Sequence, residues 1–482
     1  MSAPNNATTS NVTVNEALRT EIRRVFDRHR AHRLTMGATT ARERIERLDR
    51  LHEALLRYRD ELRRAVYADF RKPAVEFDSS ELFVVTSEIK FVKKNLRRWM
   101  RDQTVPTPLT VLGSKSWIRY ESKGTCLIIA PWNYPMQLLM GPLVSCIAAG
   151  NTAILKPSEM TPHTSAVLAR LVKEVFPENE VTLFEGDKDT AQELLALPFD
   201  HIFFTGAPAI GKIVMRAAAK HLTSVTLELG GKSPTVVDRS ADLDAAARRI
   251  TWAKFLNKGQ TCIAPDYVYV HAAVRDAFLA KVRAHIQTFY GEDAARSDSY
   301  ARMVNQRHFE RVAGYLDESV RAGATIVAGG STQASDDFIA PTVVTDVPTD
   351  SALMEEEIFG PVLPVNSFTD LQEVIDVINA RPKPLSMYIY SNNRKNVDRL
   401  LALTRAGATA INHSIVQYMN HHLPFGGANN SGIGNSHGWW GFDAFSDKRA
   451  VYKQLLPSAT QMLMPPYDGA KQRLVDLLVR WF

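Results

Sequence analysis

The pattern of hydrophobic and polar positions changes along the chain. Over residues 15–100 apolar residues recur at helical spacing, as at Leu48, Leu51 and Leu55, with few helix breakers, which predicts a mostly helical segment. Over residues 117–253 short apolar runs bounded by Gly or Pro alternate with helix-like stretches. The expected strands are 126–130, 152–155, 181–184, 201–204 and 225–229. This alternation predicts β-α units around a largely parallel sheet.

A second α/β domain is expected after residue 262. Strand-like runs at 267–270, 325–328, 362–365 and 386–390 are separated by helix-like stretches. Two further segments, 117–123 and 450–455, could extend as an arm to another subunit. Residues 471–482 place Leu474, Leu477, Leu478 and Trp481 on one helical face, with Arg473, Asp476 and Arg480 off it. We favour packing on the protein's own surface or on a partner subunit over binding to a membrane surface.

Bulk properties narrow the class of protein. The length of 482 residues suggests two or three domains, and 45% hydrophobic with 23% charged residues is ordinary for a globular protein. Three cysteines give no disulfide framework and suit the reducing cytoplasm. No secretory signal or stretch of about 20 apolar residues is present, so we expect no stable membrane anchor. The net charge of +6 is spread among interleaved acids, which argues against nucleic-acid binding and fits an anionic cofactor.

Three residues are candidates for catalysis. Cys262 lies among small and polar residues, whereas Cys126 and Cys146 lie in apolar runs typical of the core. Asn133 directly follows a strand. It is either a turn residue or a residue whose side-chain amide donates a hydrogen bond to an oxyanion. Glu228 lies in an apolar strand just before two glycines. Burial there would raise its pKa and make it a candidate general base; the alternative is a glutamate that ends the strand in a salt bridge.

Other segments suggest a nucleotide site. Lys156 and Glu159 follow a strand and could contact ribose or phosphate, or form a surface ion pair. The strand, glycine turn and helix start over 201–211 suit a pyrophosphate. However, Pro208 stands where the second glycine of the dinucleotide fingerprint belongs, so this signal is weak alone. The acidic run 355–357 by itself suggests only a solvated helix end.

Taken together, these motifs resemble the aldehyde dehydrogenase superfamily from about residue 15 to the C-terminus. Five sequence motifs are similar to those of the class 3 branch: 259–267, 423–427, 430–434, 437–438 and 464–467. This branch covers fatty, medium-chain and aromatic aldehyde dehydrogenases, and coniferyl aldehyde dehydrogenases lie nearby. The resemblance implies an α/β fold with a Rossmann-type cofactor domain, a catalytic domain and a small oligomerisation arm. The expected boundaries are a disordered tail over 1–14, a cofactor domain over 15–229 interrupted by the arm near 102–123, a catalytic domain over 230–425, and a return over 426–482 that ends in an oligomerisation strand and an amphipathic helix.

The resemblance also implies a mechanism. Cys262 would attack an aldehyde to give a thiohemiacetal, whose oxyanion the Asn133 amide and the Cys262 N–H would hold. After hydride transfer, Glu228 would activate water to hydrolyse the thioester. The implied cofactor residues are Lys156, Glu159, Gly206, Gly211, Glu357 and Phe359. The negative charge of Glu159 favours NAD, with NADP as an alternative, and no metal is implied.

The implied substrate contacts are apolar. They are Trp132, Tyr134, Ile415, Tyr418 and Met419, which suit an aliphatic or aromatic aldehyde. The class further implies a homodimer. Two alternatives stay open: an enzyme that passes the acyl group to coenzyme A, and a non-catalytic relative that serves as a structural or binding protein. The retained Glu228 argues against the first, and the presence of all three catalytic candidates argues against the second.

Overall fold

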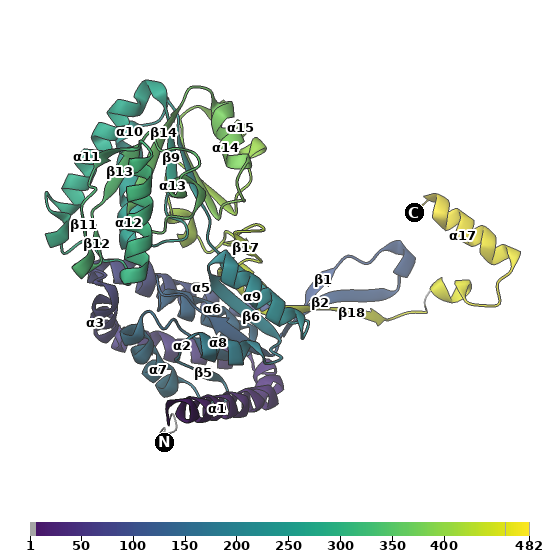
Figure 1. The fold of residues 1–482 in the computed structure, drawn as a ribbon. Helices are drawn as coiled ribbons and strands as arrows, with labels where there is room; N and C mark the ends of the chain where they lie inside the picture. The colour runs from purple at the N-terminus through teal and green to yellow at the C-terminus, as the bar shows by residue number, and fades with distance from the viewer. Residues whose placement is uncertain (1–5, 458, 482) are drawn as a thin grey trace, which may run out of the picture.

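A computed structural model describes residues 6–457 and 459–481. The chain forms two α/β lobes, one above the other in Figure 1, and an arm that projects sideways and ends in the C-terminal helix. The lower lobe is built on a six-stranded sheet in the order β17-β7-β6-β3-β4-β5. Its strands are β3 (Thr125–Ile129), β4 (Thr152–Lys156), β5 (Val181–Leu183), β6 (His201–Gly206), β7 (Ser224–Leu229) and β17 (Gly432–Ile433). All neighbours are parallel except β17 and β7, which confirms the expected α/β class and its parallel sheet.

Helices cover both faces of the six-stranded sheet. Because side chains alternate along a strand, Leu127 and Ile154 pack on one face with Phe26 of α1, while Cys126 and Ile128 pack on the other. The helices of this lobe are α1 (Asn6–Gly37), α2 (Ala41–Arg57), α3 (Arg59–Phe70), α4 (Ala74–Phe77), α5 (Phe83–Trp99), α6 (Gln137–Ala149), α7 (Pro162–Val175), α8 (Lys188–Leu195), α9 (Pro208–Ala219) and α16 (Gly438–Ala444). A single π-helical turn, η1 (Asp78–Leu82), joins α4 to α5.

The upper lobe contains a seven-stranded sheet in the order β10-β13-β14-β9-β8-β15-β16. Its strands are β8 (Pro234–Val237), β9 (Tyr267–His271), β10 (Thr325–Ala328), β13 (Thr342–Thr345), β14 (Val362–Phe368), β15 (Ser386–Tyr390) and β16 (Ala408–Ile411); a separate hairpin pairs β11 (Thr332–Gln333) with β12 (Phe338–Ile339). The helices are α10 (Leu243–Phe255), α11 (Arg275–Tyr290), α12 (Gln306–Arg321), α13 (Ala352–Glu355), α14 (Leu371–Asn379) and α15 (Arg394–Leu403). Short 3-10 turns are η3 (Leu256–Gly259), η4 (Ala272–Val274), η5 (Ala294–Arg296), η6 (Ala334–Asp336) and η7 (Val416–Met419).

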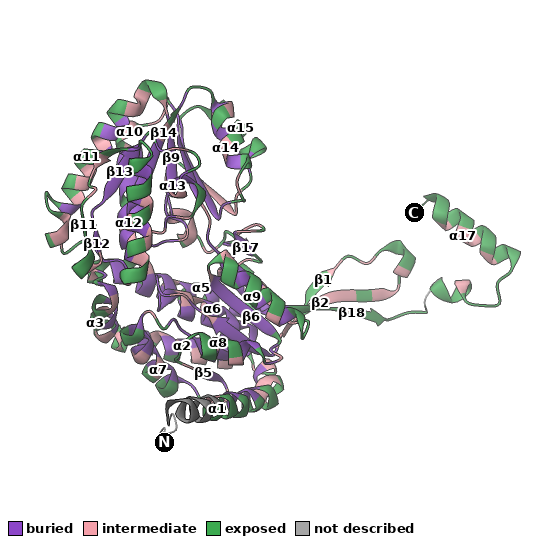
Figure 2. Ribbon diagram, viewed as in Figure 1, coloured by how far each residue is buried: buried purple, intermediate pink, exposed green. Residues whose placement is uncertain are grey.

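The arm is a three-stranded antiparallel sheet of β1 (Gln103–Val105), β2 (Ser114–Ser122) and β18 (Ser446–Gln454). It joins the two segments that the sequence marked as a candidate arm. The central sheets of the two lobes are buried, whereas in the arm β18 is mostly exposed and β2 is mostly half-buried (Figure 2). Two 3-10 turns, η2 (Leu109–Val111) and η8 (Ala459–Leu463), lie on the arm, and α17 (Gly469–Trp481) follows. No described side chain of α17 is buried.

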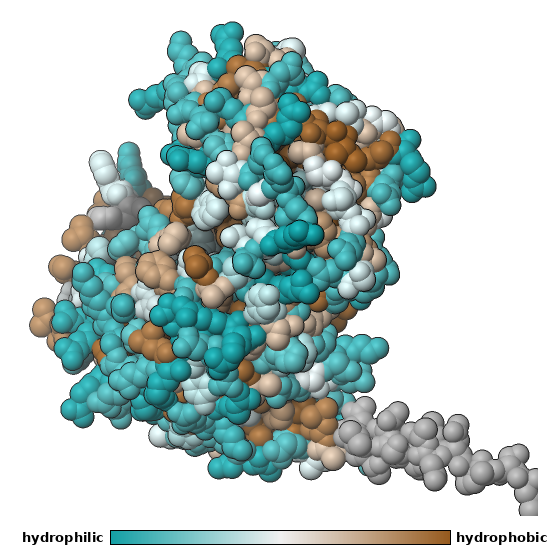
Figure 3. Space-filling view, turned by 90° about the vertical axis from the view of Figure 1, so that its left-hand side faces the viewer, coloured by the Kyte–Doolittle hydropathy of each residue, from teal (hydrophilic) through white to brown (hydrophobic). Residues whose placement is uncertain are grey.

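Some local expectations differ from the structure. Helix α1 begins at Asn6, inside the segment expected to be a disordered tail, and residues 1–5 lie outside the described part of the chain. Strands β8, β13 and β16 were not anticipated. Runs of four residues carry only a weak periodic signal, so some strands of that length, such as β10, were found and these three were missed. The face in Figure 3 is mostly hydrophilic, with apolar side chains in separate patches. Among the described residues, no helix has the length and apolarity needed to cross a bilayer.

Candidate functional site

Cys262 lies in a tightly constrained loop between the two lobes. Asn257, Lys258 and Gly259 have φ angles of 49°, 57° and 75°, a left-handed run that is costly for Lys258. At Gly259 a Cβ would lie 2.4 Å from the carbonyl oxygen of Gly360, so only glycine fits. The Gln260 side chain donates to the Arg302 carbonyl (3.1 Å) and accepts from the Val304 N–H (3.0 Å). These constraints fix the thiol in place.

Asn133 is brought to the same loop by the turn after β3. It is buried, and its Nδ2 donates to the carbonyl of Gln260 at 3.0 Å, two residues before Cys262. The adjacent Tyr134 hydroxyl lies 2.6 Å from Thr261 Oγ1. The expected juxtaposition of this amide and the thiol segment is therefore present.

Glu228 occupies β7 and is buried. Its Oε1 accepts a hydrogen bond of 2.9 Å from Ser436 Oγ, while its Oε2 has no partner among the described residues. Burial raises its pKa to about 8, although the Ser436 hydrogen bond lowers it. The alternative of a salt-bridged strand end does not hold, because no cation pairs with Glu228 within the described chain. The pKa of Cys262 is raised to about 12 by burial, then by the charges of Glu357 and Glu228.

A cleft of about 540 Å³ adjoins the thiol and suits a dinucleotide. Asn133, Gly206, Glu228, Cys262, Glu357 and Phe359 line it. A Cβ on Gly230 would lie 2.1 Å from Glu357 Oε2, so this glycine makes room for the carboxylate. Burial, and then the charge of Asp266, raises the pKa of Glu357 to about 8. Phe359 packs edge-on against Trp132, with ring centroids 5.4 Å apart.

The predicted pyrophosphate turn is a strand–turn–helix unit. β6 ends at Gly206, α9 begins at Pro208, and residues 206–209 line the cleft, so the positive end of the helix dipole faces it. Gly211 is buried, and a Cβ there would meet Leu229 at 2.8 Å, so its role here is to let α9 approach β7. These groups fit a nicotinamide dinucleotide, because a helix start that can bind an anion and a carboxylate that can accept from a ribose hydroxyl share one cleft.

Lys156 and Glu159 lie beyond the lining of this cleft. Lys156 is buried at the end of β4, donates to the Pro157 carbonyl (2.7 Å), and lies 3.4 Å from the half-exposed Glu159 carboxylate. Burial lowers the pKa of this lysine. This geometry is compatible with both interpretations from the sequence, a surface ion pair and a contact to ribose or phosphate, because an i,i+3 ion pair can also contact a ribose.

An apolar cavity of about 230 Å³ leads to the thiol from another side. Its walls include Tyr134, Ile415, Tyr418 and Met419, as expected, together with Trp252, Phe425 and Cys262. Trp132 differs from expectation, since it lines the cofactor cleft and packs against Phe359. The Tyr418 hydroxyl accepts a hydrogen bond from Gln137 Nε2. A third, smaller cavity of about 40 Å³ also reaches both Cys262 and Glu228.

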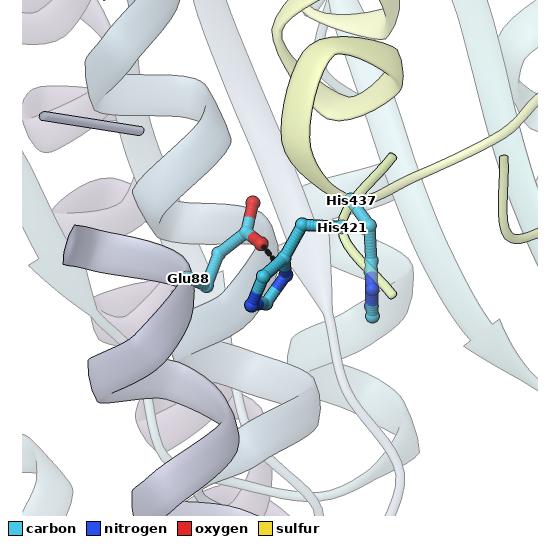
Figure 4. A group of neighbouring side chains, drawn as sticks. All are labelled: Glu88, His421 and His437. Carbon is cyan, nitrogen blue, oxygen red and sulfur yellow. Dashed lines mark ion pairs between the residues drawn. The ribbon is translucent and has the colours of Figure 1, made fainter. Parts of the chain in front are cut away.

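Sequence reasoning missed a polar cluster behind the small cavity (Figure 4). Glu88 of α5 forms an ion pair of 2.8 Å with His421, and its other oxygen accepts the Gly438 N–H at 2.7 Å. Together with His437 these side chains offer metal-ligand atoms within 4.8 Å of one another. The two atoms of this ion pair, Glu88 Oε2 and His421 Nδ1, are buried, and neither has a hydrogen-bond partner within the described chain. The only advance signal was the sequence spacing of the two histidines, which reveals nothing about α5.

Comparisons with known proteins agree with this site. Residues 3–451 match the profile of the Aldehyde dehydrogenase family. The chain is 41% identical over 426 residues to the 4,4'-diaponeurosporen-aldehyde dehydrogenase of Staphylococcus aureus, covering 88% of this chain and 92% of that protein. It is 40% identical over 407 residues to the dimeric NADP-preferring aldehyde dehydrogenase of Canis lupus familiaris, covering 84% and 89%.

A solved structure, the substrate-bound state of Staphylococcus aureus AldH, superposes with a TM-score of 0.91 at 39% identity. The alignment covers 95% of this chain and 99% of that one. The chain thus shares extensive sequence identity and its fold with aldehyde dehydrogenases, and it also has the Cys262 thiol, the Asn133 amide and the Glu228 carboxylate described above. The chain belongs to the aldehyde dehydrogenase family.

Proposed function

We propose that the protein oxidises apolar aliphatic or aromatic aldehydes to carboxylic acids through a covalent intermediate on Cys262. One observation carries this proposal: the three cavities meet at Cys262, and Glu228 borders two of them. The substrate can therefore enter through the apolar cavity while the cofactor occupies the cleft. The thiol sits where both would meet.

In the first half-reaction, the Cys262 thiol first loses its proton to solvent water, and the thiolate sulfur then bonds to the carbonyl carbon while the π electrons move to oxygen. Asn133 Nδ2 and the Cys262 N–H are the donors for this oxyanion, and such donors are worth several kcal/mol in enzymes that use them. A bound NAD(P) would supply the acceptor for the hydride that leaves as the carbonyl reforms. A thioester on Cys262 remains.

In the second half-reaction, Glu228 Oε2 takes a proton from water whose oxygen attacks the thioester carbon. The C–S bond then breaks and the thiolate is released with the acid. The unpartnered Oε2 is available for this proton, while Ser436 holds the other oxygen.

For the cofactor, we propose that Glu357 holds the nicotinamide ribose and that Lys156 and Glu159 meet the adenosine ribose. Gly206 shapes the pyrophosphate turn. A negative Glu159 would repel a 2'-phosphate, which favours NAD, while the NADP-preferring relative supports NADP as an alternative.

We further propose a cytoplasmic homodimer. Three free cysteines suit a reducing compartment, and the projecting arm offers strand edges to a second copy. The relative described as dimeric supports this assembly.

The test is the formation of NADH from NAD, and of NADPH from NADP, with aliphatic aldehydes of rising length and several aromatic ones. Activity should require Cys262, so Cys262→Ala should abolish NADH formation. Unchanged activity in this variant would contradict the proposed mechanism. Adding coenzyme A tests the alternative acceptor. Acyl-CoA formed in place of the free acid would overturn the hydrolytic role of Glu228.

A further inference from the structure

Lys72 and Glu81 form a fully buried ion pair that the proposed reaction does not use. Their Nζ and Oε1 atoms lie 2.6 Å apart, and both side chains have no exposed surface. Burying two charges is costly, and apolar replacements of such pairs are often neutral or stabilising. Stability alone is therefore a poor explanation for this pair.

Both charges contact the turn that carries Asn133. Lys72 Nζ donates to the Asn133 carbonyl at 3.4 Å and lies 3.9 Å from the ring centroid of Tyr134. Glu81 Oε2 accepts the N–H groups of Met136 (3.0 Å) and Gln137 (3.2 Å). The ion pair therefore holds the main chain on both sides of the turn.

The same segment also holds the thiol loop. Glu76 Oε1 accepts the Asn257 N–H, and Asn257 Nδ2 donates to the carbonyls of Asn133 (2.7 Å) and Gln260 (3.2 Å). The Asn133 carbonyl thus receives hydrogen bonds from two sides. Glu81 lies in the π-helical turn η1, and such turns recur at functional sites.

We propose that Lys72 and Glu81 are positioning residues that fix the Asn133 amide for oxyanion binding. This inference rests on the proposed role of Asn133. Oxyanion stabilisation depends on donors that are already aimed at the developing charge, and small displacements are costly. An ion pair tied to the main chain at residues 133, 136 and 137 supplies that rigidity without touching substrate.

The test is a double-mutant cycle on the pre-steady-state NADH burst at saturating aldehyde. Lys72→Met with Glu81→Gln removes both charges together, while the glutamine oxygen can still accept a backbone N–H. The burst rate should fall at least about 10-fold with cofactor Kd unchanged. In an Asn133→Ala background the same pair of substitutions should change the burst rate less than about twofold, because the amide that they position is gone.

The matched control is Lys93→Met with Asp49→Asn, a part-exposed ion pair between α5 and α2, which should leave the burst rate unchanged. If the buried double variant does not fold, Glu81→Asp enters the same cycle with a smaller expected fall, because it keeps both charges and only withdraws the carboxylate from the Met136 and Gln137 N–H groups. An unchanged burst rate, or an equal fall with and without Asn133, overturns the positioning role. If Asn133→Ala itself leaves the burst rate unchanged, the proposed oxyanion role of Asn133 fails instead.

Discussion

Ser436 Oγ donates a 2.9 Å hydrogen bond to Glu228 Oε1 and leaves Oε2 without a hydrogen-bond partner in the described chain. The two residues come from segments 208 positions apart, joined where β17 pairs with β7. One carboxylate oxygen is thus held while the other is available as a base. A carboxylate with one free oxygen suits the proposed activation of water.

Replacing Glu228 by Gln should separate the two half-reactions. The acyl-enzyme should still form and deliver one burst of NADH, because the oxyanion donors remain. Turnover should then fall by about 10²–10⁴-fold, the usual contribution of a general base. Stopped-flow absorbance measures both phases. Loss of the burst with cofactor binding intact would assign Glu228 an earlier role.

The deacylation rate should depend on pH through Glu228. Its pKa is raised to about 8 by burial, so the carboxyl is mostly protonated below that pH and cannot accept a proton from water. The hydrolysis rate of preformed acyl-enzyme should therefore rise with pH and level off above about 8. Ser436→Ala removes a hydrogen bond that lowers this pKa and should move the midpoint upward. A midpoint unchanged by Ser436→Ala would contradict this account.

Glu357 should contribute to cofactor binding and its neighbour Glu356 should not. Both residues line the cleft, but the Glu357 carboxylate packs against Gly230, whereas Glu356 is exposed to solvent. Above the Glu357 pKa of about 8, where the carboxyl is ionised, losing a charge-assisted hydrogen bond of about 1.5–3 kcal/mol predicts that Glu357→Gln raises the NAD Kd by roughly 10- to 150-fold. Titration calorimetry measures the Kd, and Glu356→Gln is the matched control. Equal affinities for the two variants would remove Glu357 from the site.

Sequence patterns predicted the parts of the site that depend on local order. The strand ends that carry Asn133 and Glu228 could be found because apolar runs stop at turn residues. The Cys262 loop could be found because its sequence resembles that of a known family. The contacts of Ser436, Glu88 and Lys72 could not be found. They join segments far apart in the chain, and a lone Ser, Glu or Lys within a helix or loop carries no periodic signal of its tertiary partner.

Glu159 should influence the choice between NAD and NADP. Its carboxylate is half-exposed and 3.4 Å from Lys156 Nζ, so it would repel a 2'-phosphate and also offset the lysine charge. Glu159→Gln keeps the size and removes the charge. We expect kcat/KM for NADP to rise several-fold relative to NAD. Initial rates with both cofactors measure this ratio, and an unchanged ratio would place the 2'-hydroxyl elsewhere.

The C-terminal helix should act between two copies of the chain or at the entrance to the substrate cavity. In α17, Leu474, Leu477, Leu478 and Trp481 share a face, yet no described residue of the helix is buried, and the helix lies well away from both lobes in Figure 1. An uncovered apolar face is unfavourable in water, so a covering surface is expected. If the chain is truncated after Leu456, the proposed dimer should dissociate at a higher protein concentration in analytical ultracentrifugation, or the enzyme should change its preference for aldehyde chain length.

The matched control for this truncation keeps the helix and alters only its polar face. Arg473→Gln with Arg480→Gln removes two charges without touching the leucines, so dimer mass and substrate range should stay as in the full chain. The truncation keeps β18 intact, so its effect would be specific to the segment after the arm. Identical dimer mass and identical chain-length preference in the truncated protein would show that the apolar face of α17 serves neither purpose.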